Sequence, residues 1–457
     1  MTSPRAQALE RDPAARGSAL LFWAQLAGNS GLFVALVLVT RALGPSGRGT
    51  IAFITVAAIL LARVARLGVS DATTVFTAQR PGERPALLTN LVLFVSTSTA
   101  VVAILVCALL AAMPASLRPD GIGSDELVLL GLAALASGFA DAGYTFLLGC
   151  SRFRLHALTS AVTAWLYVLL VAALEASVGL TIAWAALAWI AIQLLKGFFM
   201  LAVAVRDAGV GAPDRALLGE AVRFGVRAWF GSLSDALNDR LDQIITAFIA
   251  SQAVLGFYSV AVNASEILFY LPAAAATALL PVAARSDPRA RVDGVLRTFR
   301  SVTLVSVGCI GLGATLGPVL VPLVFGAPFH ESVRPFLLLL PAALGYVALG
   351  IFSSALVASG APGRSSVGPL VSLALATALD FVLIPRYGAS GAAGAAAFGY
   401  LAGGGAALAL YRGWASFSWG ALLRPEAGDL DLVRALVRPL TQRPKGPVLR
   451  AGENPHA

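Results

Sequence analysis

The sequence predicts an all-α polytopic membrane protein with twelve transmembrane helices in two lobes of six. Apolar residues make up 58% of the 457-residue chain and charged residues only 12%, whereas soluble domains carry about 25% charged residues. The mean hydropathy is +0.81. Unbroken apolar runs such as Leu87 to Met113 are long enough to cross about 30 Å of hydrocarbon as helices.

This composition excludes whole classes of protein. Too few polar groups are present to cover a water-facing globule, so soluble enzymes and disordered proteins do not fit. A transmembrane barrel would alternate apolar and polar residues along each strand, and the apolar runs here are continuous. Membrane proteins keep arginine and lysine on the cytoplasmic side, which accounts for the net charge of +9. We therefore expect no nucleic-acid partner.

The predicted spans fall into two groups on either side of a polar break. Residues 1–17 are a predicted cytoplasmic N-terminus, residues 206–226 a cytoplasmic inter-lobe linker, and residues 412–457 a cytoplasmic basic tail. The first lobe, 18–205, holds spans 18–40, 49–70, 87–113, 127–149, 156–175 and 179–205. The second lobe, 227–411, holds spans 227–250, 254–284, 299–325, 335–358, 366–385 and 389–411.

The distribution of arginine predicts the orientation. With this layout, most of the 33 basic residues fall on one side of the membrane. The opposite side holds Arg41, Arg48, Arg118, Arg334 and Arg386. Because basic residues stay in the cytoplasm, both termini are predicted to be cytoplasmic. The arginine- and alanine-rich composition suggests a bacterial inner membrane.

Two weak internal matches predict a repeat. The segment Gly49 to Leu61 matches Gly256 to Leu268, and the hinge near Gly149 matches the one near Gly360. Both offsets are nearly the same. Six is an even number, so the halves are predicted to be parallel repeats, an architecture that commonly places a substrate path between its lobes.

The seventh span carries an acidic stripe. On a helix of 100° per residue, Asp235, Asn238, Asp239 and Asp242 share one face. One hypothesis is that this stripe binds a coupling cation or proton, because ionisable groups within spans are costly and commonly functional. The alternative is structural hydrogen bonding to neighbouring helices.

Other ionisable residues lie within spans. Arg240 and Glu266 lie at similar depths, which predicts a buried ion pair or a transport switch. Arg240 is also a candidate, with Arg63 and Arg66, for binding the substrate head group. Arg63 and Arg66 share a face of the second span; they either bind a phosphate-bearing head group or anchor the helix at the interface. Lys196, Asp141 and Asp380 stand in apolar surroundings, and the two aspartates are further candidates for ion coupling.

Signals of catalysis are poor. The three histidines lie beside no nucleophile, and no nucleotide-binding fingerprint occurs. The cysteines show no metal-ligand spacing, and the pair Asp429 and Asp431 stands in a polar tail. We therefore predict that the protein is not an enzyme and has no cofactor or metal site.

Four stretches resemble a known family. These are Val39 to Gly49, Asn238 to Arg285, Val324 to Phe329 and Asp380 to Ala397. They resemble the polysaccharide transporter and lipid-linked oligosaccharide flippase branch of the multidrug/oligosaccharidyl-lipid/polysaccharide exporter superfamily. The resemblance implies a V-shaped pair of lobes working by alternating access, with the sugar head group in a cationic cavity and the polyprenyl tail in lipid.

The resemblance covers some site residues and not others. Arg240, Asp242 and Glu266 lie in the matching stretches, whereas the arginines of the second span have no motif counterpart. Asp380 stands where the family pattern has an asparagine.

The leading hypothesis is a flippase that exports an undecaprenyl-linked oligosaccharide for surface polysaccharide synthesis. Its expected partners are the lipid bilayer, a coupling cation or proton, and other polysaccharide assembly proteins. The alternatives are a cation-coupled drug or metabolite antiporter and a membrane-embedded glycosyltransferase or polymerase.

Overall fold

The computed structural model of the chain describes residues 13–423. The side chains of residues 13–22, of Pro362 and of several residues between 228 and 282, Asp235 among them, are not part of that description. Helices account for nearly all of the described residues, and no strand occurs among them. The all-α prediction is confirmed.

The first half of the chain forms a bundle of long helices. Its helices are α2 (Pro13–Ala65), α3 (Val69–Gln79), α4 (Arg84–Ala112), α5 (Ser124–Gly149), α6 (Phe153–Val178) and α7 (Ile182–Ala208). We call this bundle the N-lobe. Its core is built from alanine, leucine and valine side chains of α2, α5, α6 and α7.

The second half forms the C-lobe. Its helices are α9 (Gln252–Ser265), α10 (Ile267–Arg285), α11 (Pro288–Phe325), α12 (Val333–Leu339), α13 (Ala342–Ala358), α14 (Pro362–Ser365), α15 (Val367–Tyr387), α16 (Ala389–Ala415) and α17 (Trp419–Leu423). Helix α8 (Arg215–Ile249) connects the two lobes. Short 3₁₀ turns occur at Pro81–Glu83, Ala115–Leu117 and Ala327–Ser332.

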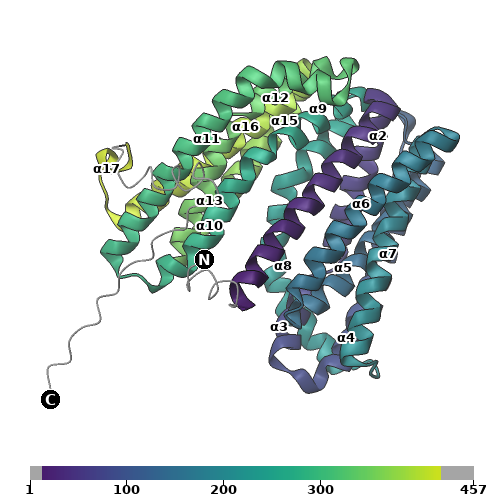
Figure 1. Ribbon diagram of the computed structural model, residues 1–457, viewed down its shortest axis with the longest axis horizontal. Helices are drawn as coiled ribbons and strands as arrows, with labels where there is room; N and C mark the ends of the chain where they lie inside the picture. The colour runs from purple at the N-terminus through teal and green to yellow at the C-terminus, as the bar shows by residue number, and fades with distance from the viewer. Residues whose placement is uncertain (1–12, 424–457) are drawn as a thin grey trace, which may run out of the picture.

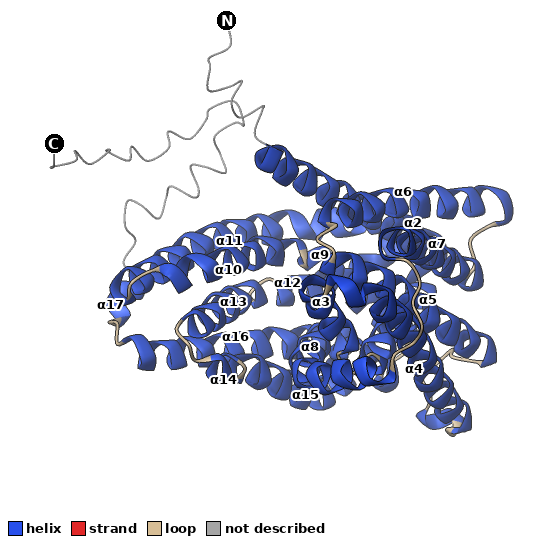
Figure 2. Ribbon diagram, turned by 90° about the horizontal axis from the view of Figure 1, so that it is seen from below, coloured by secondary structure: helices blue, strands red, loops and turns tan. Residues whose placement is uncertain are grey.

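The two lobes meet at one end and diverge toward the other (Figure 1), and the view from below shows them side by side (Figure 2). Helices α9 and α12 lie at the joined end, which α2 reaches after rising from the divergent end, and α3 and α17 lie toward the divergent end. The arginine-rich turns at Arg80 and Arg289 belong to the divergent end, which we call the basic end.

The predicted count of twelve spans is not confirmed. Among the described residues, nine helices are long and apolar enough to span a membrane, or ten when the bent pair Ala327–Leu339 and Ala342–Ala358 is one span. The first predicted span, 18–40, lies within α2, and the second, 49–70, begins in α2 and runs past its end at Ala65. Helix α8 is not among the nine because charged residues recur along its whole length.

Helix α2 is broken at Gly44. This glycine has φ 66° and ψ −173° and is followed by Pro45. Proline disfavours helical geometry in the residue before it and suits the first turn of a new helix, and glycine tolerates a positive φ. The break therefore turns the chain between the first two predicted spans.

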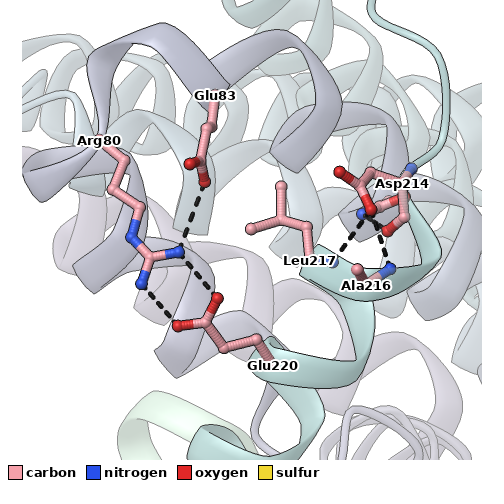
Figure 3. A network of polar contacts seen from close by, with 7 residues as sticks. Arg80, Glu83, Asp214, Ala216, Leu217 and Glu220 are labelled. Atoms are coloured by element: carbon pink, nitrogen blue, oxygen red, sulfur yellow. Dashed lines mark hydrogen bonds and ion pairs between the residues drawn. The ribbon is translucent and has the colours of Figure 1, made fainter.

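Two helices extend into residues 206–226, the predicted inter-lobe linker. Helix α7 continues to Ala208 and α8 begins at Arg215. The Asp214 carboxylate accepts hydrogen bonds from the backbone N–H groups of Ala216 and Leu217, a favourable N-cap. Arg80 of the N-lobe pairs with Glu220, as Figure 3 shows. The first turns of α8 are thus attached to the N-lobe.

The joint between the lobes follows the sequence repeat. A β-carbon on Gly49 would lie 1.8 Å from the Gln252 carbonyl oxygen, and one on Gly256 would lie 2.0 Å from that of Pro45. Pro45 and Gln252 are related by the same sequence offset as Gly49 and Gly256. Reciprocal contacts of this kind are those a two-fold relation produces, so the two halves meet through equivalent positions.

Candidate functional site

A cavity of about 140 Å³ in the N-lobe gathers cationic side chains. Arg63 in the last turn of α2 and Arg66 in the turn that follows it line the cavity together with Lys196 of α7. Asp141 and Tyr144 of α5 complete its polar wall. Arginine and lysine can both hold phosphate oxygens. The two arginines predicted from the second span therefore share a cavity, to which the structure adds Lys196.

Arg66 forms an ion pair with Asp141. The sequence does not indicate this partner, because Arg66 and Asp141 are 75 positions apart. The side chains are 18% and 29% exposed, so the pair offsets much of the cost of placing either charge in a membrane span. Arg63 is exposed, and its side chain forms no ion pair among the described residues. Its carbonyl oxygen accepts a hydrogen bond from Trp229 of α8.

Lys196 also lines a second N-lobe cavity, of about 220 Å³. That cavity is bounded by α2, α6 and α7, and it includes His156, Asn29 and Gln25. The His156 ring packs against Tyr144 with centroids 3.9 Å apart. Because Lys196 lines both cavities, the two form one polar region that extends from α5 to α2 within the N-lobe.

The C-lobe contains a larger cavity, of about 390 Å³, beside α8. Asp239, Arg240 and Asp242 enter it from α8, and Glu266 enters from the junction of α9 and α10. Tyr400 of α16 lies on the opposite wall. Three of the six candidate ion-coupling residues, Asp239, Asp242 and Glu266, therefore line one cavity.

The predicted pair of Arg240 and Glu266 is present. The Arg240 Nη1 atom lies 2.7 Å from Glu266 Oε1, and the side chains are 32% and 27% exposed. Glu266 stands at the break between α9 and α10, where a backbone hydrogen bond from Glu266 to Val262 ends the first helix. A break in a span exposes polar groups to the cavity.

Asp242 is held by two hydrogen bonds. The hydroxyl of Tyr258 donates to Asp242 Oδ2, and the Gln243 backbone N–H donates to Oδ1 at 2.7 Å. Tyr258 is fully buried, where its hydroxyl has no access to water. The Asp242 carboxylate is the hydrogen-bond acceptor for this hydroxyl. Nothing in the sequence indicates this contact, since a tyrosine within an apolar helix is commonly a core residue.

The acidic stripe predicted on α8 is divided between two surroundings. Asp239 is exposed and lines the large cavity. Asn238 instead faces α15, where its side chain bonds the Pro369 carbonyl at 3.4 Å and accepts from Ser372 at 3.2 Å. The side chain of Asp235 lies outside the described residues.

Asp380 of α15 is 1% exposed, and its Oδ1 atom has no hydrogen-bond partner among the described residues. It lines a small cavity together with Asp242 and Tyr400. The structure thereby brings together two aspartates far apart in the sequence. Their carboxylates form a compact acidic centre in the C-lobe.

The family follows from the sequence itself. The family model described as "Polysaccharide biosynthesis protein" matches residues 14–286, which is more than half of the chain. The chain belongs to this polysaccharide biosynthesis protein family, so the predicted resemblance is confirmed. A comparison with curated proteins found no match.

Solved structures share the fold across nearly the whole chain. The lipid II flippase MurJ in an inward closed conformation is 13% identical with a TM-score of 0.71, covering 92% of this chain and 91% of that one. An inward-facing multidrug resistance MATE family transporter of the MOP superfamily is 14% identical with a TM-score of 0.64, covering 85% and 94%. The fold is that of these two-lobed transporters, and the chain is a multi-pass membrane protein.

Proposed function

We propose that this protein is a flippase that moves a polyprenyl-linked oligosaccharide across the cytoplasmic membrane for surface polysaccharide synthesis. The observation that carries the proposal is the cationic N-lobe cavity of Arg63, Arg66 and Lys196 in a chain of the polysaccharide biosynthesis family. A phosphate-linked sugar carries negative charge and many hydroxyls, which hydrocarbon rejects. The planar guanidinium group of arginine can donate two parallel hydrogen bonds to such a phosphate.

The arrangement of the lobes supports an alternating-access mechanism. The lobes are in contact at one end and diverge at the basic end, which the arginine distribution assigns to the cytoplasm. The head group enters between the lobes from that side while the polyprenyl chain stays in lipid. Rocking about the Gly49–Gly256 joint then presents the head group to the outside.

The C-lobe acids are proposed to couple this motion to a cation or proton. Asp239, Asp242 and Asp380 lie around connected cavities between α8, α15 and α16. Binding a positive charge there lowers the repulsion between carboxylates in a poorly solvated region. An ion that binds one conformation more tightly shifts the lobes toward it.

Transport by purified protein in liposomes tests the proposal. The substrate is a fluorescent polyprenyl-diphosphate oligosaccharide, and its arrival in the outer leaflet is measured by quenching. Arg63→Ala breaks no ion pair among the described residues, and we expect at least a tenfold slower rate. Arg66→Ala/Asp141→Ala removes a pair without leaving a buried charge unpaired, and we expect a similar loss.

The control removes two exposed arginines outside these cavities, Arg206 and Arg215. Arg206→Ala/Arg215→Ala is expected to keep the wild-type rate. Normal transport by the Arg63→Ala and Arg66→Ala/Asp141→Ala variants would remove the cationic cavity from the mechanism.

A second candidate is a cation-coupled drug antiporter. It is favoured by the acidic C-lobe cavity and by the fold shared with a multidrug resistance transporter. Accumulation of a cationic dye in vesicles, driven by an imposed sodium or proton gradient, distinguishes it from a flippase, which leaves the dye outside.

A further inference from the structure

The C-lobe holds another cavity at its basic end, apart from the two sites described above. Its volume is about 430 Å³, and it is lined by the first turns of α11, by the end of α16 and by the residues that follow α16. In Figures 1 and 2, α17 and the neighbouring end of α11 mark this region at the tip of the C-lobe. None of its lining residues lines the N-lobe cavities or the cavities beside α8.

Two arginines and one carboxylate set the charge of this cavity. Arg289 is exposed, and Arg291 is half-buried. Arg291 donates from Nε to the Ala283 carbonyl at 2.8 Å and from Nη2 to that of Ser286 at 3.1 Å, which holds the guanidinium at the wall. With the exposed carboxylate of Asp293, the lining carries a net charge of +1, which suits a singly charged anion.

Tyr411 adds a polar residue to the lining of the same cavity. The residue is 0% exposed, yet its hydroxyl has no hydrogen-bond partner among the described residues. Its ring is fixed by Phe352 and Phe417, with centroids 5.6 and 5.9 Å away. A buried hydroxyl without a partner is unfavourable, and the cavity it lines can accommodate a ligand that accepts its hydrogen bond.

Aromatic and arginine side chains surround the cavity as they do at a lipid interface. Trp414 lines it and is 47% exposed, with the Arg364 guanidinium 5.4 Å from its ring centroid. Arg412 lies 4.3 Å from the ring centroid of Trp419. Tryptophan collects at the level of lipid head groups, and basic pockets at the cytoplasmic ends of membrane helices bind acidic head groups.

We propose that this cavity binds the phosphodiester of an anionic phospholipid. Arg289 and Arg291 hold the phosphate oxygens, and the Tyr411 hydroxyl donates to one of them. Trp414 and Phe417 line the apolar side of the same cavity and contact the glycerol and upper acyl chain. The ligand is a structural lipid of the C-lobe, separate from any transported substrate.

Lipid binding to the full-length protein in a neutral detergent tests this site. The probes are phosphatidylglycerol, phosphatidylcholine with the same acyl chains, and inorganic phosphate. Native mass spectrometry measures bound lipid, and thermal unfolding measures the stabilisation. We expect phosphatidylglycerol to be retained, phosphatidylcholine to bind at least tenfold more weakly, and inorganic phosphate to displace neither.

Two variants address the lining residues. Arg289→Gln/Arg291→Gln is expected to weaken phosphatidylglycerol binding about tenfold, whereas the control Arg206→Gln/Arg215→Gln removes the same charge from the N-lobe and binds as wild type. Tyr411→Phe keeps the packed ring; without lipid it unfolds at the same or a higher temperature than wild type, and with phosphatidylglycerol it is stabilised less.

Several results would overturn the proposal. The first is that Tyr411→Phe or the Arg289→Gln/Arg291→Gln variant binds phosphatidylglycerol as tightly as wild type does. The second is that phosphatidylcholine is retained equally. The third is displacement of the lipid by inorganic phosphate, because that indicates a site for free anions. If the arginine variant does not fold, Tyr411→Phe decides the outcome alone.

Discussion

At the scale of single residues, the contact of Arg80 with Glu220 attaches the start of α8 to the N-lobe (Figure 3). Both Arg80 terminal nitrogens bond the Glu220 carboxylate, at 2.8 and 2.5 Å, and the guanidinium lies 4.4 Å from the Phe76 ring centroid. The hydrogen bonds from Arg80 lower the pKa of Glu220 below its ordinary value. The pair is therefore sensitive to acid.

The pH dependence follows from the direction of this shift. A carboxyl group whose pKa is depressed in the folded state stabilises the protein above its unfolded pKa and loses that contribution as pH falls through the folded pKa. Glu220→Gln should therefore lower the melting temperature at pH 7 and have a smaller effect near pH 4. Melting curves of both proteins at the two values measure this. An equal difference at both would show that the pair contributes nothing through ionisation.

At the scale of elements, α8 is shared between the lobes. Its early turns approach α3 so closely that a β-carbon on Gly225 would lie 2.3 Å from the Gly68 carbonyl oxygen. Later turns contact α15 through Asn238. Motion of one lobe against the other must therefore be accommodated along α8, between these two attachments.

The close approach at Gly225 can be tested with a single methyl group. Gly225→Ala places that group against backbone, which has little freedom to move, so we expect destabilisation of about 1 to 3 kcal/mol. Gly219 on the same helix has open space around it. Gly219→Ala should be neutral or stabilising by up to about 1 kcal/mol. Denaturant or thermal unfolding compares the two, and equal effects would contradict the contact.

At the scale of the whole molecule, Arg41 connects the lobes at their joined end. Its Nε donates to the Val324 carbonyl at 2.8 Å, and Nη2 donates to that of Leu323. These carbonyls lie in the last turn of α11, where the helix dipole favours a cation. Separation of the lobes at this end requires these hydrogen bonds to break.

Removing this connection should shift the conformational equilibrium. Arg41→Gln is expected to raise the population of molecules whose lobes are closed at the basic end. The free-energy difference between the two conformations should shift by about 1 to 3 kcal/mol, because the hydrogen bonds of Arg41 are lost. The measurement is the distance distribution between spin labels at Gly82 and Gly363. Arg118→Gln is the matched control, because Arg118 also donates to two carbonyls at a helix end, but within the N-lobe. If wild type, Arg41→Gln and Arg118→Gln all give the same distance distribution, the hydrogen bonds of Arg41 do not control the separation of the lobes.

The helical class, the position of most spans and the pairing of Arg240 with Glu266 could be predicted from the sequence. Hydropathy and helix length locate a residue along the membrane normal, and two charges at equal depth in consecutive spans are natural partners. The acidic residues of 227–250 were predicted as part of a span, but the start of α8 at Arg215 was not, because it depends on capping by Asp214 and on contact with the N-lobe.

Contacts between distant helices were decided by the tertiary structure alone. The partner of Asp141 is Arg66, Asp380 lies beside Asp242, and the Tyr411 hydroxyl lines a basic cavity. In helices that are apolar on nearly every side, the amino-acid pattern leaves rotation about the helix axis undetermined. That rotation is set by close packing at glycines such as Gly49 and Gly256, and it decides which polar side chains meet.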